Sequence, residues 1–318
     1  MIEVFALYAI CALTFTVSKA ILLYSSPFFA VAVRMLIAGL LIGGYQIWSQ
    51  RHSINTKNIT TAIMQDWPLL LRIILFHIAV PYAADAWALS RITSIESSLL
   101  YNLSPFVAVF FAYLWFSERM NLKKWLGLTI GFCSTVPLII NHICSAQACT
   151  IKSFIPSLNI LPLIATLGSV LSSAYAWIVF QKLIRERGYS VATLNAIAMI
   201  GGGISCGILA LLTGECARVC LQIFDWMPFL GLTGLIILLA NIVFYNGYGM
   251  LLRRYSAPFL AFAGFSTPLF VALFGFIFLG EQLSCNYLLA TLCVVIGLYM
   301  YYHGDTKNVL KQKDKDSL

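Results

Sequence analysis

Three residues with chemical or helix-breaking character recur at intervals of four in the apolar segment 67–89: His77, Pro81 and Asp85. This spacing places them on one face of a helix. Pro81 has no N–H group, so the carbonyl of His77 loses its usual helical partner. An imidazole that can carry a proton, a carboxylate that can attract a cation and a free carbonyl would suit the wall of a polar cavity. The alternatives are that His77 is a buried neutral histidine bonded to a neighbour, and that Asp85 is an interfacial acid near the outer rim, where it could pair with Arg91.

Two further prolines, Pro105 and Pro268, lie 163 residues apart in segments of similar composition. Each removes a helical hydrogen bond, from the carbonyl of Tyr101 in the first case and from that of Gly264 in the second. Interrupted helices at matching positions of two related halves are typical of a binding site inside a membrane protein. The alternative is that both prolines only shape helix packing.

Other polar and aromatic groups fall near the middle of apolar segments. Tyr175 and Trp177 lie in one segment, and Asn241 and Tyr245 occupy in another the positions that match the region around His77. A polar group inside a bilayer either bonds a neighbouring helix or faces a cavity. The predicted binding residues are therefore His77, Tyr82, Asp85, Tyr101, Asn102, Ser104, Tyr175, Trp177, Asn241, Tyr245, Phe262, Phe265 and Thr267, with helix breaks at Pro81, Pro105 and Pro268.

The sequence contains no constellation typical of catalysis or of metal binding. Its four histidines are dispersed, and it has no Cys-x-x-Cys pair, no phosphate-binding loop and no nucleophile elbow. Four of the nine cysteines, Cys144, Cys149, Cys216 and Cys220, fall in two connecting loops, where they could form disulfides or remain free thiols. We therefore expect no enzymatic activity, no metal and no cofactor.

The composition requires a membrane around these residues. Of 318 residues, 60% are hydrophobic and only 10% are charged, and the mean hydropathy is +0.88. Soluble domains carry about 25% charged residues, and one crossing of the bilayer takes about 20 apolar residues. The net charge of +8 is scattered without a basic stripe, which excludes nucleic acid as a partner. The sequence predicts an all-α integral membrane protein with ten transmembrane helices at about 2–22, 27–48, 67–89, 94–117, 122–142, 160–183, 190–212, 227–251, 256–280 and 284–303.

Basic residues indicate the orientation of these spans. If the N-terminus is cytoplasmic, the inner loops and tail hold 14 Lys and Arg residues and the outer loops hold four. Positive residues concentrate on the cytoplasmic side of membrane proteins. We therefore expect a multi-pass protein of the plasma (inner) membrane with both termini in the cytoplasm and a polar cytoplasmic tail at 304–318.

The chain also repeats itself at an offset of 163 residues. The matching pairs are Lys19 and Lys182, Gly39 and Gly202, Gly44 and Gly207, Tyr82 and Tyr245, Arg91 and Arg254, Pro105 and Pro268, Phe111 and Phe274, and Glu118 and Glu281. Each half, 1–150 and 151–303, then holds five spans, and an odd number forces the second copy into the opposite orientation. Inverted repeats of this kind are typical of alternating-access transporters. The alternative is that duplication only enlarges a helix bundle.

Several short motifs resemble the EamA family of the drug/metabolite transporter superfamily. The first half has the segment 88–94, Ser104-Pro105, Ser117-Glu118-Arg119, Gly127 and Gly131, and the second half has the segment 254–257, Thr267-Pro268 and Gly280-Glu281-Gln282. Gln282 departs from the usual Arg, and Ala290 and Val294 replace the two glycines of the first half. Arg34 matches an Arg that the family tends to carry, and on that basis we interpret it as a structural pairing residue.

The resemblance implies secondary transport of a small organic molecule. Asp85 could attract a cation, and the aromatic side chains could stack on a heterocycle or hold an onium group. A metabolite such as S-adenosylmethionine would use all of these contacts, while export of an amino acid or a drug is the alternative within the superfamily. A lipid-handling flippase is the alternative of another class. The expected partners are a small-molecule substrate and membrane lipid, and uptake, efflux and exchange are equally compatible with the sequence.

Overall fold

Every element of the computed structural model is a helix in the residues that it describes, which are 2–49, 65–91, 97, 100–101, 103–116, 121–133, 160–216, 225–267 and isolated positions from 270 to 300. This agrees with the predicted all-α class. In chain order the elements are α1 (Ile2–Ile21), α2 (Pro27–Ser49), α4 (Trp67–Ile73), the π-helix η1 (Ile74–Ala79), α5 (Val80–Leu89), α7 (Ser104–Phe116), α8 (Leu122–Cys133), α11 (Ile160–Glu186), α12 (Val191–Leu212), α14 (Trp226–Ile236), the π-helix η2 (Ile237–Phe244), α15 (Tyr245–Leu251), α16 (Ala257–Ala263) and the 3-10 helix η3 (Gly264–Ser266).

Five helical runs in the described part of the chain are long and apolar enough to cross a membrane. They span 27–49, 67–89, 161–186, 191–212 and 226–251, close to the predicted bounds. Their outward surfaces are apolar, as at Leu40, Leu212 and Met227, whose exposed fractions are 64%, 80% and 85%. Lipid offers no hydrogen bonds, so a segment with a lipid-facing surface must pair its own backbone N–H and C=O groups, as a helix does.

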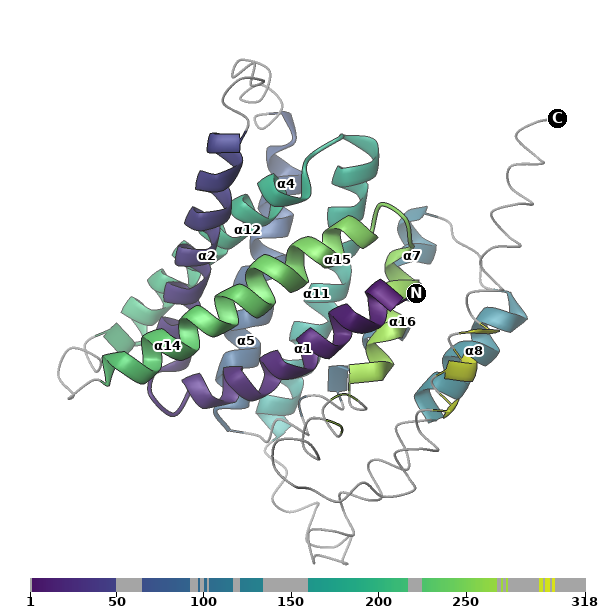
Figure 1. The fold of residues 1–318 in the computed structure, drawn as a ribbon, viewed down its shortest axis with the longest axis horizontal. Coiled ribbons are helices and arrows are strands. Elements are labelled where there is room, and N and C mark those ends of the chain that lie inside the picture. The colour runs from purple at the N-terminus through teal and green to yellow at the C-terminus, as the bar shows by residue number, and fades with distance from the viewer. Residues whose placement is uncertain are drawn as a thin grey trace, which may run out of the picture.

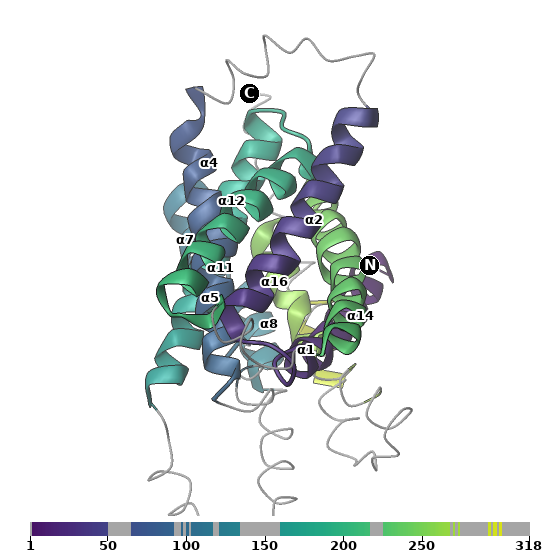
Figure 2. The same cartoon turned by 90° about the vertical axis from the view of Figure 1, so that its left-hand side faces the viewer.

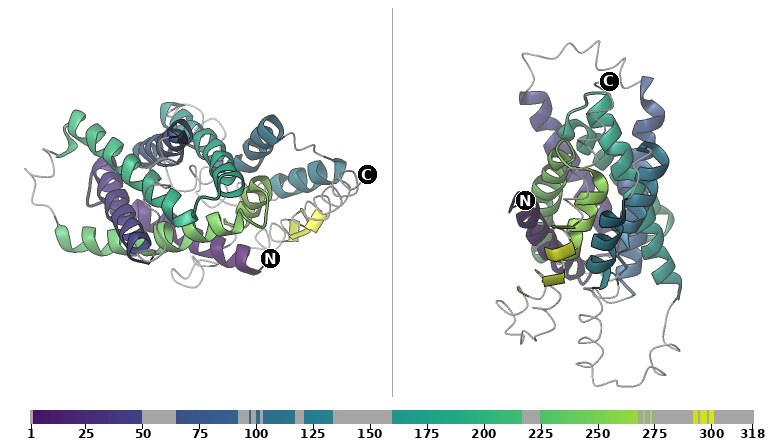
Figure 3. Two further views of the ribbon diagram at one scale, coloured as in Figure 1. Left: turned by 90° about the horizontal axis from the view of Figure 1, so that it is seen from above. Right: turned by 90° about the vertical axis from the view of Figure 1, so that its right-hand side faces the viewer.

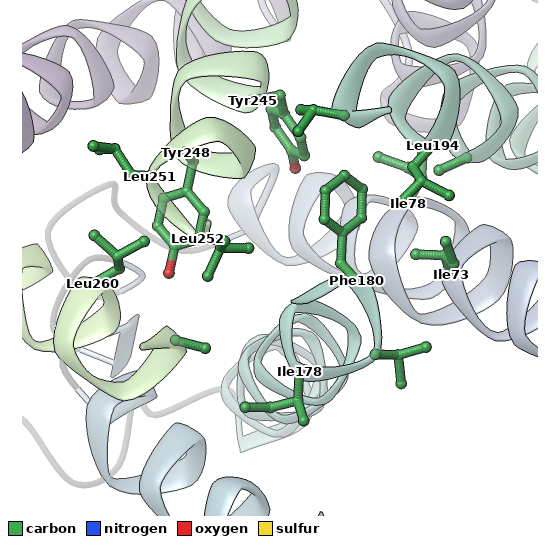
Figure 4. Close-up of a cluster of buried hydrophobic side chains, with 14 of the residues drawn as sticks. Ile73, Ile78, Ile178, Phe180, Leu194, Tyr245, Tyr248, Leu251, Leu252 and Leu260 are labelled. Carbon is green, nitrogen blue, oxygen red and sulfur yellow. The ribbon is translucent and has the colours of Figure 1, made fainter. Parts of the chain in front are cut away.

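The helices pack around a core of large apolar side chains. Met35, Phe180, Phe259 and Phe262 have at most 1% of their surface exposed, and Figure 4 shows Phe180 among aliphatic and tyrosine side chains from several helices. On one side of this core, α1 lies along α14, η2 and α15 (Figures 1 and 3).

Helices α2 and α12 pack closely and in opposite directions (Figure 2). A Cβ atom at Gly39 would lie 2.7 Å from Cγ1 of Ile200, and one at Gly203 would lie 2.9 Å from Cγ of Leu36. Gly39 of α2 meets Ile200 of α12, whereas the earlier residue Leu36 of α2 meets the later residue Gly203 of α12, so the two helices are antiparallel. Glycine is needed at both contacts because a side chain would push the helices apart.

Helix ends meet in two groups. In one, Tyr189 donates a hydrogen bond of 3.2 Å to Oδ2 of Asp66, whose Oδ1 lies 3.7 Å from Nε of Arg187. Burial, then the charge of Asp66, raises the pKa of the Tyr189 phenol. In the other, Oε2 of Glu215 accepts from the backbone N–H groups of Phe28 and Phe29, at 2.9 and 3.1 Å, at the start of α2. Segments that the charge count assigns to the same side of the membrane thus lie together.

Candidate functional site

A pocket opens between α1, α2, α5 and α14, near the C-terminal ends of α1 and α5 and the N-terminal end of α2. The empty space within and above it, which includes the open mouth, is about 440 Å³. Most of its wall is aliphatic, and four polar side chains line it: Ser18, Arg34, Tyr82 and Asp85. This combination of an apolar wall and few polar groups suits an organic molecule with a charged part.

Asp85 enters the pocket wall from α5. Its Oδ1 accepts a hydrogen bond of 3.3 Å from Ser97. The possible pairing of Asp85 with Arg91 is wrong because Arg91 turns back on its own helix end. There it donates to the carbonyl of Trp87 at 2.9 Å and lies 4.1 Å from the centre of the Trp87 ring.

A short chain of hydrogen bonds links α5 to α11 and to the region before α7. The hydroxyls of Tyr101 and Ser169 lie 2.9 Å apart, and Ser169 donates to the carbonyl of Pro81 at 3.0 Å. Pro81 follows the widened turns of η1, so the helix departs from regular α-geometry next to the pocket. The structure therefore brings two predicted residues, Tyr101 and Pro81, together through a serine that sequence reasoning did not select.

Arg34 contributes the positive charge of the pocket. Its side chain is only 7% exposed, its Nε donates to Oδ1 of Asn241 at 2.8 Å, and its guanidinium lies 5.1 Å from the centre of the Tyr82 ring. The interpretation of Arg34 as a pairing residue is thus correct as far as Asn241 is concerned. Sequence reasoning missed that Arg34 also lines the pocket, although a charge so deep in a span is itself a signal of function.

His77 lies away from the pocket, inside an aromatic cluster. It is 1% exposed, and its ring centre lies 4.4 Å from that of Trp177, 5.1 Å from Tyr245 and 5.2 Å from Phe180. Figure 4 shows Phe180 and Tyr245 converging from α11 and α15. Neither ring nitrogen of His77 has a hydrogen-bond partner among the described residues, so the alternative of a histidine bonded to a neighbour is wrong.

One hydrogen bond connects the pocket to the aromatic cluster. The hydroxyls of Tyr82 and Tyr245 lie 2.5 Å apart, with Tyr82 in the pocket wall and Tyr245 against His77 and Trp177. One continuous region therefore joins five predicted binding residues: His77, Tyr82 and Asp85 of the first half, and Trp177 and Tyr245 of the second.

The other predicted residues are not in the pocket wall. Tyr175 packs edge to face on Phe76, with ring centres 5.3 Å apart, and Phe262 packs in the same way on Phe265 at 5.3 Å. Of the remaining residues, Ser104 begins α7, Thr267 follows η3, and Asn102 and Pro268 lie outside the described residues.

The predicted helix breaks have a local counterpart in two places. Pro105 lies in the first turn of α7, directly after a turn at Leu103, and the α-helix α16 gives way to the 3-10 turn η3 at Gly264. Cys216 is a free thiol, whereas Cys144, Cys149 and Cys220 lie outside the described residues. Within the described part of the chain, no group of three His, Cys, Asp or Glu side chains could hold a metal ion.

Known proteins similar to this chain are transporters. The S-adenosylmethionine/S-adenosylhomocysteine transporter of Chlamydia muridarum is 27% identical over 295 residues, which cover 92% of this chain and 88% of that protein. A transporter of the same name from Chlamydia trachomatis serovar L2 is 26% identical over 304 residues, covering 92% and 85%. The uncharacterized transporter YvbV of Bacillus subtilis is 24% identical over 286 residues, covering 88% and 84%.

The fold is also found in a solved crystal structure of a protein with 16% sequence identity. The two superpose with a TM-score of 0.67 over 94% of this chain and 93% of the other. The model of the EamA-like transporter family matches residues 1–140 and again residues 160–302. With both halves matched, the chain belongs to the EamA-like transporter family and is a multi-pass membrane transporter rather than an enzyme.

Proposed function

We propose that this transporter carries S-adenosylmethionine across the plasma membrane by alternating access, and that S-adenosylhomocysteine is its second substrate. The observation that carries the proposal is a carboxylate, Asp85, beside a tyrosine ring, Tyr82, in the wall of a mostly aliphatic pocket. The names of the chlamydial relatives supply the substrate.

The chemistry of the pocket suits this substrate. S-adenosylmethionine has a cationic sulfonium, an amino-acid end and an adenine ring. A carboxylate attracts the cation, which is costly to bring into a membrane without a counter-charge. The ring of Tyr82 offers a face for a cation or a heterocycle, and the aliphatic wall excludes water from both.

Alternating access rests on the relation between the two halves. The equivalent helices α2 and α12 pack antiparallel, and the π-helices η1 and η2 begin at Ile74 and Ile237, 163 residues apart. The family model matches the chain twice. An axis in the membrane plane would interchange such halves, so a conformation open to one side has a counterpart open to the other.

The two ends of the molecule support an assignment of the conformation. The pocket opens at the end of α1, α2 and α5 that the charge count places outside. At the opposite end Asp66, Arg187 and Tyr189 join α4 to the connection between α11 and α12. The described conformation therefore suits an outward-facing carrier that is closed toward the cytoplasm.

Uptake into proteoliposomes tests the proposed function. Purified protein should accumulate radiolabelled S-adenosylmethionine with saturable kinetics, and faster when the liposomes are preloaded with S-adenosylhomocysteine. Unlabelled S-adenosylhomocysteine should compete, whereas methionine, adenosine and a lipid headgroup should compete weakly. Absence of uptake above protein-free liposomes, with saturable uptake of methionine or another amino acid, would replace this proposal by an amino acid carrier. Transbilayer movement of a labelled lipid instead would replace it by a flippase.

A further inference from the structure

Two charges of opposite sign, a buried arginine and a half-buried aspartate, face one pocket without forming an ion pair. Arg34 from α2 and Asp85 from α5 both line it. Among the described residues, the pairs within 4.0 Å are Lys182 with Glu186, Arg187 with Asp66 and Arg254 with Glu3, so neither pocket charge is in one.

A charge in this position needs compensation. Removing a guanidinium from water costs several kcal/mol, and proteins recover it by pairing the charge or by exposing it to a ligand or a water-filled cavity. Arg34 is 7% exposed and uses Nε on the neutral amide of Asn241. A guanidinium has five N–H donors, and among the described residues Asn241 is the acceptor for one of them, so the others can serve an anion that enters the pocket.

Asp85 has the complementary need. Among the described residues its hydrogen-bond donors are neutral hydroxyls, such as Ser97 at 3.3 Å. Arg91, six residues later, is held by Trp87 instead. A carboxylate with only neutral donors on one wall and a guanidinium with a neutral acceptor on another define a space with a positive and a negative end.

We propose that Arg34 and Asp85 together form a site for a substrate with charges of both signs, in which Arg34 binds the α-carboxylate of the substrate and Asp85 binds its cationic sulfonium group. The proposal deepens the proposed function and rests on it for the identity of the substrate. Arg34 then has a second role beside its bond to Asn241. Because Arg34 needs an anionic partner, the substrate must carry a carboxylate, and amines and onium ions without one are poor substrates. The ring of Tyr82 lies 5.1 Å from the Arg34 guanidinium, and Asp85 follows Tyr82 by three residues on the same helix, so all three side chains line the pocket.

Binding to the wild-type protein gives the first test. S-adenosylmethionine and its decarboxylated analogue carry the same sulfonium, amine and adenosine groups and differ only in the carboxylate. A hydrogen-bonded charge pair of this kind should favour the carboxylated ligand by about 10- to 100-fold in Kd. Titration of both ligands into protein in nanodiscs measures this ratio, and equal Kd values overturn the proposal without any variant.

Substitution of Arg34 gives the second test. Arg34→Gln should weaken S-adenosylmethionine by about 10- to 100-fold and leave the decarboxylated analogue nearly unchanged, so the ratio falls to near one. Binding of the analogue also reports that the variant is folded. Arg34→Lys, which keeps the charge but not the planar fork, should give an intermediate ratio. The matched control is Arg72→Gln, at an exposed arginine of α4, which should keep the wild-type ratio.

The outcomes separate this inference from the proposed function. If the wild type transports S-adenosylmethionine and Arg34→Gln weakens both ligands equally, the proposed site is wrong and the function stands. If the wild type transports a different amino acid and discriminates against its decarboxylated amine through Arg34, the site stands and the proposed substrate is wrong. If Arg34→Gln does not fold, the Kd ratio of the two ligands in the wild type and in Arg34→Lys still decides. The site is contradicted if the wild type shows no preference for the carboxylated ligand and Arg34→Lys has the same ratio as the wild type.

Discussion

The hydroxyls of Tyr82 and Tyr245 lie 2.5 Å apart, and the two residues are 163 positions apart in the chain, the interval at which the sequence repeats. The family model matches the chain once in each half, so this hydrogen bond joins equivalent positions of the two matched segments. The surroundings differ in the two halves: Asp85 of the first corresponds to Tyr248 of the second, and His77 to Ala240. The pocket therefore has one charged half although the helices that carry it are duplicated.

Removal of either tyrosine hydroxyl should destabilise the protein more than removal of both. Tyr82→Phe or Tyr245→Phe leaves one partly or fully buried hydroxyl without its partner, which costs about 1–3 kcal/mol. The double variant has no such group and should be closer to the wild type. Thermal unfolding in detergent measures the series, with Tyr113→Phe, at a residue 57% exposed, as the control. Additive losses in the double variant would contradict the coupling.

Neutralising Asp85 should weaken a cationic substrate specifically. Asp85→Asn keeps the shape and the bond to Ser97 but removes the charge that attracts the cation. The half-saturation concentration for S-adenosylmethionine should rise by about tenfold, as for loss of one charge-assisted contact. Competition by S-adenosylhomocysteine, which lacks the sulfonium charge, should change less.

The control for this change is Asp225→Asn, at an exposed carboxylate directly before α14. It should leave uptake of both compounds unchanged. Equal effects of Asp85→Asn on the two compounds would place Asp85 in the framework of the pocket rather than on the substrate.

Helix positions were predictable from the sequence because lipid imposes a minimum apolar length and tolerates few charges. The spans at 67–89 and 227–251 agree with helices that end at Leu89 and Leu251. The π-helices inside these two runs have no signature in hydropathy, since they change the backbone bonding and not the residue types. The positions of the two π-helices could therefore be found only from the three-dimensional structure.

The candidate site was predictable in its residue types and less so in its contacts. Intramembrane Asp85 and Arg34 were visible as costly charges. Which group compensates each of them depends on rotamers and on the crossing of helices far apart in the chain. Arg34 meets Asn241 across 207 positions, whereas Arg91, the charged neighbour of Asp85 in sequence, turns away to Trp87.

The packing of α12 on η1 gives a prediction about the fold. A Cβ atom at Gly202 would clash with the side chain of Ile78, whereas one at Gly44 would have no atom within 4 Å. Gly202→Ala should lower stability by about 1–3 kcal/mol through overpacking. Gly44→Ala should be neutral or stabilising, by up to about 1 kcal/mol, because alanine is the better helix former. Thermal unfolding of the two variants measures the difference, and equal stabilities would show that α12 and η1 are not in contact.

His77 offers a test of function against stability. Both of its ring nitrogens are buried without a partner among the described residues, while its ring packs on Trp177, Tyr245 and Phe180. His77→Phe keeps the ring and removes the two nitrogens, so it should raise stability by about 1 kcal/mol. If the imidazole carries a proton during transport, the same variant should lose accumulation driven by a pH gradient and keep exchange of labelled for unlabelled substrate. Uptake with and without an imposed gradient, in the same proteoliposomes, measures both activities. A variant that is more stable and fully active in both assays would assign His77 to packing alone and leave Arg34, Tyr82 and Asp85 as the groups that act on the substrate.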